Sequence, residues 1–434
     1  MKRIALLFII ASACLLSCKD ASQSREIVFD YPIVETWRNT GNYGIYNGVI
    51  TEEVLRNYLS RAITEAEFLH SERLNIDGYY GTEDDERMLL NIGAKFVGRA
   101  MYSWGKETTF LDTQRFTDAK ARIDRMHAKD PDIIFQACLF EIITPQVENI
   151  KIPDWVFEAF GKAPEDRNFS YNAIKTDKEA NQNQWGENTG VPDISKEEAQ
   201  MWFYYMAVRY MEIGIEALHC GQTMLMSSFG DSAQGYPSYT KLFKLIREAA
   251  KTKARRGIVL LDSHCTGMKL GDGNILLDSG AFPMRLKEIE TSTKFEAELK
   301  PGYLDSMIGL TVSGTTPSGW KTDRLPYMLE FDNWGISDHP GKYKKSGDIY
   351  CWGYDEISWF SQLDEETAEE FLRYAVTWMA DNDPMGYIEM PGCRIAYGGK
   401  GWPEVRAYRC NTKSDACPTG RNMENVIKAI WSQK

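Results

Sequence analysis

The stretch DIIFQACLFE at residues 132–141 shows the pattern on which the fold depends. Residues 133–140 are almost all apolar, which is typical of a strand buried on both faces in a parallel sheet. An amphipathic helical segment at 116–129 comes before this run, and Glu141 follows it. The stretch therefore predicts a buried strand that follows a helix and presents a carboxylate at its carboxyl end.

The same alternation of helix and strand continues along the chain. Apolar strands are predicted at 96–104, 132–140, 215–222, 257–264, 325–334 and 386–390, with 307–312 as a further candidate. Helices are predicted at 51–59, 84–95, 116–129, 195–211, 241–253, 364–381 and 422–431. The helix at 195–211 begins with a capping box formed by Ser195 and Glu198.

Strands separated by helices form right-handed βαβ units, whose strands are parallel. The pattern therefore favours an α/β fold, and the best single architecture is a (β/α)8 TIM barrel with long βα-loop insertions. The segments 144–194 and 265–305 would be those loops, since they are rich in Asn, Asp, Gly and Pro. An open, doubly wound sheet is the alternative.

Composition excludes several classes of protein. The chain has 434 residues, of which 43% are hydrophobic and 26% charged, so it is long enough for a large core and is not a disordered protein. The net charge is −12 and there is no concentrated basic face, which argues against nucleic acid as a partner. No glycine-rich phosphate or dinucleotide loop follows an early strand, so no cofactor is predicted.

The amino terminus carries the features of an export signal. Lys2 and Arg3 precede the apolar-rich residues 4–16, and Leu15-Leu-Ser-Cys18 has the small residue before cysteine that is typical of a lipobox. This segment resembles bacterial lipoprotein signals, which implies cleavage before Cys18 and lipidation of its thiol. An ordinary secretory signal or an anchor helix is the alternative.

The resulting division of the chain is a signal peptide at 1–17, a polar tether at 18–30 and one (β/α)8-like catalytic domain at 31–434. The lipid on Cys18 would attach the protein to a membrane of the cell envelope. Of the remaining cysteines, Cys410 and Cys417 are close in sequence, and in an exported protein they are predicted to form a disulfide. Half of a metal site is the alternative for this pair.

Polar residues follow the predicted strands, at the ends where a barrel places its active site. Because side chains two apart on a strand point to the same face, Glu330 and Asp332 should lie together, and so should Asp262 and His264. A carboxylate in an apolar strand is costly to bury unless it is paired or faces a cleft. The candidate site residues are Trp104, Glu141, His219, Gln222, Asp262, His264, Glu330, Asp332, Asn333, Trp334, Glu389 and Arg394.

Two carboxyl groups across a cleft are the requirement for cleaving a glycosidic bond, with one as proton donor and the other as nucleophile or base. The predicted catalytic pair is Glu330 or Asp332 together with Glu141 or Glu389. The other candidates would bind an oligo- or polysaccharide substrate, since indole rings stack on the C–H face of a sugar and polar groups bind its hydroxyls. A structural ion pair or cap is the competing interpretation of each strand-end carboxylate.

Two other functions remain open. His219, Asp262 and His264 could bind a divalent metal in a metal-dependent hydrolase, although their spacing matches no known motif. Alternatively, a lipid-anchored, aromatic-rich chain could bind glycans without catalysis. A catalytic pair of carboxylates would favour the enzyme, and an aromatic platform without carboxylates within reach would favour the binding protein.

Three segments together carry a resemblance to a known group of proteins. They are the lipobox with Lys19-Asp20 behind it, the segment IPDWVFEAF at 152–160, and the strand end MLEFDNW at 328–334. They resemble lipoproteins of gut Bacteroidetes that are similar to TIM-barrel glycoside hydrolases. The resemblance implies an outer-membrane location and a role in polysaccharide utilisation, and it transfers no catalytic residue.

Overall fold

The structure is a computed structural model that describes residues 38–70, 82–289, 296–333, 343–346, 349–352, 355–396 and 405–432. The predicted signal peptide and tether, the lipidation residue Cys18 and the candidate Trp334 therefore lie outside the described residues. Within the described ranges, no helix has the length and apolar character needed to cross a membrane.

The centre of the molecule is a set of short parallel strands. The larger sheet has the order β16-β15-β1-β2-β3-β4-β5, and only β16 is antiparallel to its neighbour. The smaller sheet has the order β14-β11-β6 and is parallel throughout. The strands are β1 (Ala62–Glu65), β2 (Phe96–Met101), β3 (Ile134–Cys138), β4 (Ala217–His219), β5 (Leu260–Asp262), β6 (Gly280–Pro283), β11 (Tyr327–Glu330), β14 (Gly386–Ile388), β15 (Met390–Ala396) and β16 (Arg406–Arg409).

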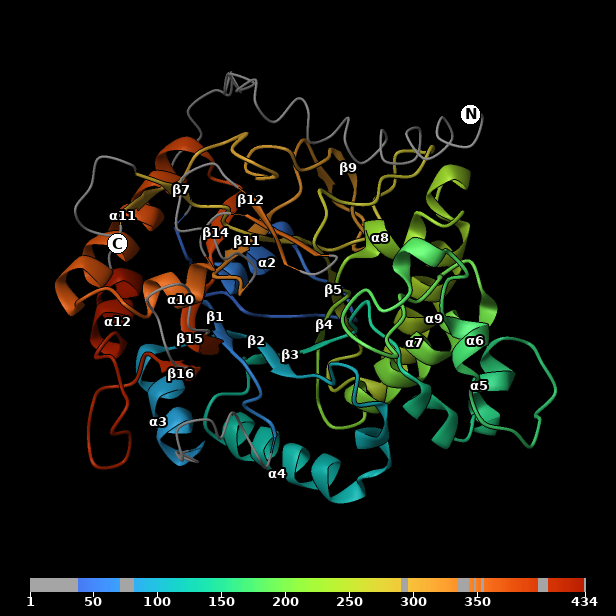
Figure 1. Cartoon of the computed structure of the whole chain (residues 1–434). Helices are drawn as coiled ribbons and strands as arrows, with labels where there is room; N and C mark the ends of the chain where they lie inside the picture. Colours follow the sequence, from blue (N-terminus) through green and yellow to red (C-terminus); the bar gives the residue numbers. More distant parts are fainter. Residues whose placement is uncertain are drawn as a thin grey trace, which may run out of the picture.

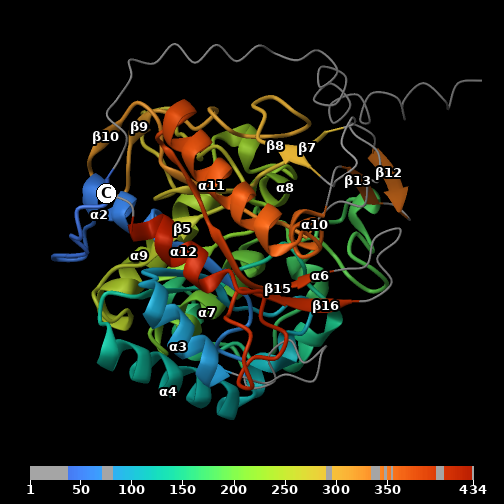
Figure 2. The same ribbon diagram turned by 90° about the vertical axis from the view of Figure 1, so that its left-hand side faces the viewer.

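Helices surround these strands (Figure 1). Figure 2 shows α11 and α12 on one side of the strands, with α3 and α4 further down. The longer helices are α2 (Glu52–Leu59), α3 (Thr82–Ile92), α4 (Thr113–Lys129), α7 (Glu197–Met211), α9 (Pro237–Lys253), α11 (Glu365–Asn382) and α12 (Glu424–Ser432).

Shorter elements lie in the connections between the central strands and helices. The short helices are η2 (Glu107–Leu111), η3 (Pro145–Asn149), α5 (Asp154–Ala159), α6 (Tyr171–Ile174), η4 (Glu179–Asn181), α8 (Thr223–Ser227), η5 (Ser232–Gln234) and α10 (Glu356–Phe360). The paired short strands are β7 (Lys287–Glu288) with β8 (Ala297–Glu298), β9 (Gly314–Thr315) with β10 (Lys321–Thr322), and β12 (Tyr343–Ser346) with β13 (Ile349–Trp352). The predicted alternation of helix and strand, and the parallel pairing of the strands, are confirmed.

The two sheets are connected at both edges. On one side, β14 and β15 are separated only by Glu389, and β14 pairs with β11 while β15 pairs with β1. On the other side, Asp278 N donates to Leu261 O at 2.8 Å and Ala281 N donates to Ser263 O at 3.1 Å. Backbone hydrogen bonds therefore reach from β5 to the segment that enters β6.

One buried cluster fills the space between the amino-terminal ends of the strands. β1 to β6, β11 and β14 each contribute one apolar side chain to it, and α2 contributes Val54, Leu55, Tyr58 and Leu59. Helix α2 begins where the sequence predicts, because the Thr51 hydroxyl accepts a hydrogen bond from Val54 N. This helix therefore covers the end of the strands opposite to the predicted site.

Four predictions about local structure are wrong. Residues 307–312 form no strand, and the strand β6 lies inside the segment 265–305 that was predicted to be a loop. The capping box at Ser195 does not form, because the Ser195 hydroxyl donates to Asp193 at 2.5 Å and the N-cap of α7 is Lys196. The predicted disulfide is also absent: Cys410 is a buried free thiol whose Sγ contacts Met88 Sδ at 3.6 Å.

Candidate functional site

A layer of polar side chains lies directly above the apolar cluster at the base of the strands. Side chains along a strand alternate between its two faces. On each strand, the residue two positions after the one in the apolar cluster therefore points to the same side of the strand as that cluster residue, one layer further along. Polar residues occupy these positions on most of the strands, and all of them are buried. They are Thr64, Gln136, His219, Asp262, Glu330 and Glu389, with Gly98 at the equivalent position of β2.

His219 and Asp262 form a buried pair on the neighbouring strands β4 and β5. Asp262 Oδ1 lies 2.6 Å from His219 Nδ1, and Asp262 Oδ2 accepts a hydrogen bond from Gln136 Nε2 at 2.6 Å. Burial raises the pKa of Asp262 to about 8 and lowers the pKa of His219 well below its usual value. His219 Nε2 is buried and has no hydrogen-bond partner among the described residues.

Glu330 is the centre of an ion-pair network. Arg99 Nε donates to Glu330 Oε2 at 2.6 Å, and Arg394 Nη1 donates to the same oxygen at 2.9 Å. His264 Nε2 lies 2.6 Å from Glu330 Oε1. Burial alone would raise the pKa of Glu330, but the two guanidinium groups outweigh it and hold the pKa well below its usual value. Glu330 is therefore ionised.

Glu389 is in the opposite ionisation state from Glu330. Glu389 lies between β14 and β15. Its carboxyl group occupies the space that Gly98 leaves open, because a Cβ atom added to Gly98 would be 1.9 Å from Glu389 Oε1. Burial, with the negative charge of Glu330 as the second cause, raises the pKa of Glu389 to about 8, and the positive charge of Arg99 opposes part of this effect. The side chain is therefore a protonated acid at neutral pH.

Asp332 is the outermost carboxylate of this network. Arg394 Nη2 donates to Asp332 Oδ1 at 2.9 Å, and Arg285 Nη1 is 3.7 Å from Asp332 Oδ2. Arg394 also donates to Asn333 Oδ1 at 3.2 Å. Glu330, Asp332 and Asn333 are therefore gathered around one arginine, and Glu330 and Asp332 lie together as their spacing predicts.

Glu141 is held separately by the segment after β4. Gln222 N donates to Glu141 Oε2 at 3.0 Å, and Gln222 Nε2 donates to Glu141 Oε1 at 2.9 Å. A Cβ at Gly221 would be 2.2 Å from Glu141 Oε2, so this glycine gives the carboxylate its space. Glu141 lies close enough to His219 to affect the pKa of that ring.

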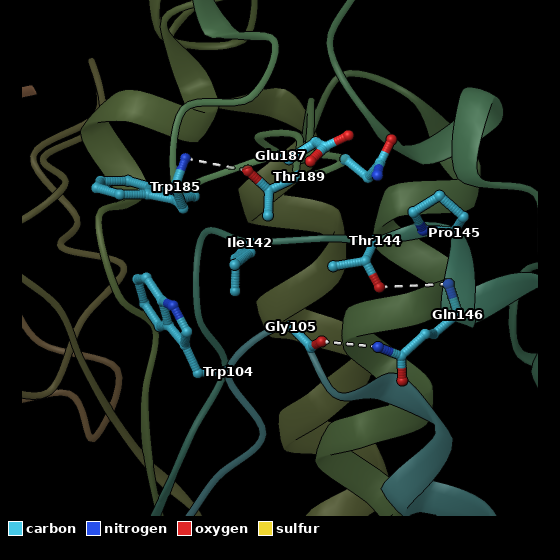
Figure 3. Close-up of a pocket in the computed structure, with 10 residues that line it drawn as sticks. Trp104, Gly105, Ile142, Thr144, Pro145, Gln146, Trp185, Glu187 and Thr189 are labelled. Atoms are coloured by element: carbon cyan, nitrogen blue, oxygen red, sulfur yellow. Dashed lines mark hydrogen bonds between the residues drawn. The ribbon is translucent and has the colours of Figure 1, made fainter. Parts of the chain in front are cut away.

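A pocket of about 370 Å³ opens beside Glu141, between the segments that follow β2 and β3. Trp104 and Trp185 form one wall, and Thr144, Pro145 and Gln146 lie across from them (Figure 3). The ring of Trp104 is 5.1 Å from that of Phe140, and the ring of Phe140 is 6.2 Å from that of His219. The pocket is therefore connected to the buried polar layer by one aromatic ring.

The structure brings most of the predicted site residues to one end of the strands. His219, Asp262, His264, Glu330 and Glu389 interact directly or electrostatically, and Asp332, Asn333 and Arg394 extend the same network. Glu141 and Gln222 pair with each other, and Trp104 lines the pocket.

Sequence reasoning missed Arg99, Gln136 and Trp185. Arg99 and Gln136 could have been found, because each is a polar residue inside an otherwise apolar strand and needs a buried partner. Trp185 stands in a long loop, and no pattern in the sequence places it beside Trp104.

The metal alternative is not supported by the arrangement of its ligands. Among the described residues, no three His, Cys, Asp or Glu side chains are grouped so that they could hold a metal ion. His219 faces Asp262, whereas His264 faces Glu330. The three proposed ligands therefore belong to two neighbouring pairs, in which the ring centroids of His219 and His264 lie 4.6 Å apart.

Comparison with known proteins identifies distant structural neighbours. No protein-family model and no curated protein matches the sequence. Among solved structures, a debranching enzyme from Nostoc punctiforme is similar over 87% of this chain and 80% of that chain, with 10% identity and a TM-score of 0.40.

Two further neighbours are similar over a smaller part of this chain. A GH27 β-L-arabinopyranosidase from Geobacillus stearothermophilus matches 48% of this chain and 49% of that chain, with 11% identity and a TM-score of 0.28. A GH36 α-galactosidase from the same organism matches 47% of this chain and 28% of that chain, with 12% identity and a TM-score of 0.27. The match thus spans about half of the first enzyme and less of the second.

Proposed function

We propose that the central strands close into a (β/α)8 barrel and that the protein is a glycoside hydrolase. Closure is supported by the shared strand β14–β15 on one side and by the hydrogen bonds from Asp278 and Ala281 to the β5 strand end on the other. It is also supported by the buried cluster to which β1 to β6, β11 and β14 each contribute a side chain.

The observation that carries the enzymatic proposal is the presence of two interacting carboxyl groups in opposite ionisation states. Glu330 is held ionised by Arg99 and Arg394, and Glu389 is held protonated by burial and by the charge of Glu330. A pair of acids whose pKa values are pushed apart is what general acid catalysis of glycosidic cleavage requires.

Within this network we assign Glu389 as the proton donor and Asp332 as the carboxylate that activates water or attacks the sugar. Glu330 is less suited to attack, because both of its oxygens are occupied by Arg99, Arg394 and His264. Asp332 is paired by Arg394 on one oxygen, whereas its other oxygen is 3.7 Å from Arg285. Asp332 therefore keeps one oxygen that is only loosely held.

The experiment that tests this assignment compares turnover with binding. Purified Glu389→Gln and Asp332→Asn variants are assayed for reducing-end release from a panel of neutral polysaccharides, and Glu248→Gln on the exposed side of α9 is the matched control. We expect about a 100- to 10,000-fold loss of turnover in the first two variants, the usual contribution of a general acid or base, with glycan binding retained. Full turnover in Glu389→Gln would show that this residue is only a buried core acid.

A glycan-binding protein without catalysis is the second candidate. It is favoured by one observation: the open aromatic pocket is lined by Trp104 and Trp185, while Glu330 and Glu389 lie buried in the strand layer. Saturable glycan binding by the wild-type chain, combined with no bond cleavage on any polysaccharide of the panel, would select this function over the hydrolase.

We further propose that Cys18 carries a lipid that holds the chain in the outer membrane of a bacterial cell envelope, in a polysaccharide-utilisation setting. The lipobox is the support for this proposal. In a bacterial host, a Cys18→Ala variant should lose label from a lipid precursor and leave the membrane fraction, whereas a Cys14→Ala variant should keep both. Equal labelling of the two variants would contradict the proposal.

A further inference from the structure

We infer that the pocket between Trp104 and Trp185 is a separate subsite that binds an uncharged sugar ring and discriminates against acidic sugars. The inference rests on the proposed function only in taking carbohydrate as the class of ligand. It concerns binding, so its test does not depend on turnover.

The shape and walls of the pocket suit a sugar. Its volume of about 370 Å³ is at the lower end of the range of about 300–1,000 Å³ that is typical of small-molecule sites. Figure 3 shows the two indoles on one side, Ile142 between the walls, and the polar Thr144 and Gln146 opposite. An indole face packs on the C–H face of a pyranose, while exposed polar groups at the rim of such a pocket bind the hydroxyls.

The aromatic wall is fixed before any ligand arrives. Trp185 Nε1 donates to Glu141 O at 3.0 Å, and Trp185 N donates to Thr189 Oγ1 at 3.0 Å. The rings of Trp104 and Trp185 meet edge to face with centroids 5.5 Å apart, and Trp104 is nevertheless 39% exposed. A rigid and exposed ring binds with little loss of side-chain entropy.

The opposite wall is also fixed. Gln146 Nε2 donates to Gly105 O at 3.1 Å, and its Oε1 accepts from the Thr108 hydroxyl at 2.8 Å. The amide of Gln146 is therefore occupied, and the polar side chains at the rim, Glu187 and Asn188, are the exposed ones. These two residues are the groups that would bind sugar hydroxyls.

Charge sets the specificity. Among the described residues that line the pocket, Glu187 carries the charge, and none is an arginine or a lysine. A carboxylate accepts hydrogen bonds from sugar hydroxyls but repels the carboxylate of a uronic acid or a sulfate ester. The negative charge of the whole chain, −12, acts in the same direction. The pocket is therefore selective for neutral glycans.

The pocket is placed to act together with the buried layer. Trp185 is bound to the backbone of Glu141, whose carboxylate is bound to Gln222 at the end of β4. Phe140 lies between Trp104 and His219. The pocket is thus joined to the end of β4 by packed side chains and hydrogen bonds.

The test measures binding by isothermal titration calorimetry with the full chain. The probes are neutral tetrasaccharides (malto-, cello-, xylo- and manno-) and oligogalacturonate of the same length. We expect at least one neutral probe to bind and oligogalacturonate to bind at least tenfold more weakly. Trp104→Ala should weaken the neutral probe at least tenfold, and Tyr46→Ala, which removes an exposed aromatic ring elsewhere, should leave it unchanged.

A second variant tests the charge argument without removing an aromatic ring. Glu187→Gln should raise the affinity for oligogalacturonate several-fold and reduce that for the neutral probe by less. Absence of binding by every neutral probe, unchanged binding in Trp104→Ala, or equal binding of oligogalacturonate by wild type would each overturn the inference. The turnover assay on Glu389→Gln is separate, so a pocket that binds in a protein that does not cleave would refute the proposed function alone.

Discussion

At the scale of single residues, Glu330 is the carboxylate with the most charged partners in the buried network. It neutralises two guanidinium groups that are themselves buried, those of Arg99 and Arg394. Replacing Glu330 by Gln leaves these charges without a full counter-charge, so we expect a loss of about 3–5 kcal/mol in the free energy of unfolding. Urea unfolding followed by circular dichroism measures it.

The Glu389→Gln variant is the control for this prediction, and its free energy of unfolding is compared with that of Glu330→Gln. Near pH 4, Glu389 is protonated in the folded state and largely so in the unfolded state, so at that pH its amide variant should unfold within about 1 kcal/mol of wild type. A Glu330→Gln variant as stable as Glu389→Gln would mean that the two arginines find other partners, and the network assignment would then be wrong.

At the scale of elements, α2 is expected to support the fold from the end opposite to the site. Leu59 is fully buried against the first residues of the strands. We expect Leu59→Ala to lower the free energy of unfolding by about 2–5 kcal/mol, because it leaves a cavity at the base of the strands. Affinity for the neutral tetrasaccharide, measured below the melting temperature, should not change. A tenfold weaker affinity would show that the base and the pocket are coupled.

The sequence predicted most elements because their apolar patterns are local. The strands at 134–138 and 327–330 lie within predicted apolar runs, and α11 starts at Glu365, one residue after the predicted start of the helix at 364–381. β1 and β6 were missed because each has only a few residues, and β6 contains Gly280 and Pro283, which are typical of loops. Pairing within a sheet makes such segments into strands, and no local pattern shows that pairing.

The sequence predicted that the candidate residues gather at one end of the strands, but it did not predict their ionisation states. Strand alternation places Glu330 and Asp332 on one face, and in the structure they lie together, where both accept hydrogen bonds from Arg394. Whether a carboxylate is ionised depends on partners distant in sequence: Arg99 for Glu330, and the missing side chain of Gly98 for Glu389. The sequence therefore identified the acids, whereas their opposite states required the three-dimensional arrangement.

At the scale of the whole molecule, the buried acids predict an unusual dependence of stability on pH. Burial raises the pKa of Asp262, Glu356 and Glu389 to about 8 each. The unfolded chain releases these protons near pH 4, so between about pH 4 and 8 the folded state binds more protons than the unfolded state. The free energy of unfolding therefore falls as the pH rises through this window.

Other carboxylates set the acid limit. Glu424 is buried, but hydrogen bonds from Arg87, Thr412 N and Asn91 lower its pKa to about 2, and Glu330 is lowered as well. A lowered pKa contributes stability above about pH 4.5 that is lost as the pH falls toward 2. We therefore expect maximal stability near pH 4.5–5, in urea unfolding series from pH 3 to 9. In Glu389→Gln the free energy of unfolding should fall less steeply above pH 5, because this variant lacks one of the acids that bind a proton in the folded state and release it on unfolding. A stability that rises steadily to pH 8 in wild type would contradict the assignment of these acids as protonated.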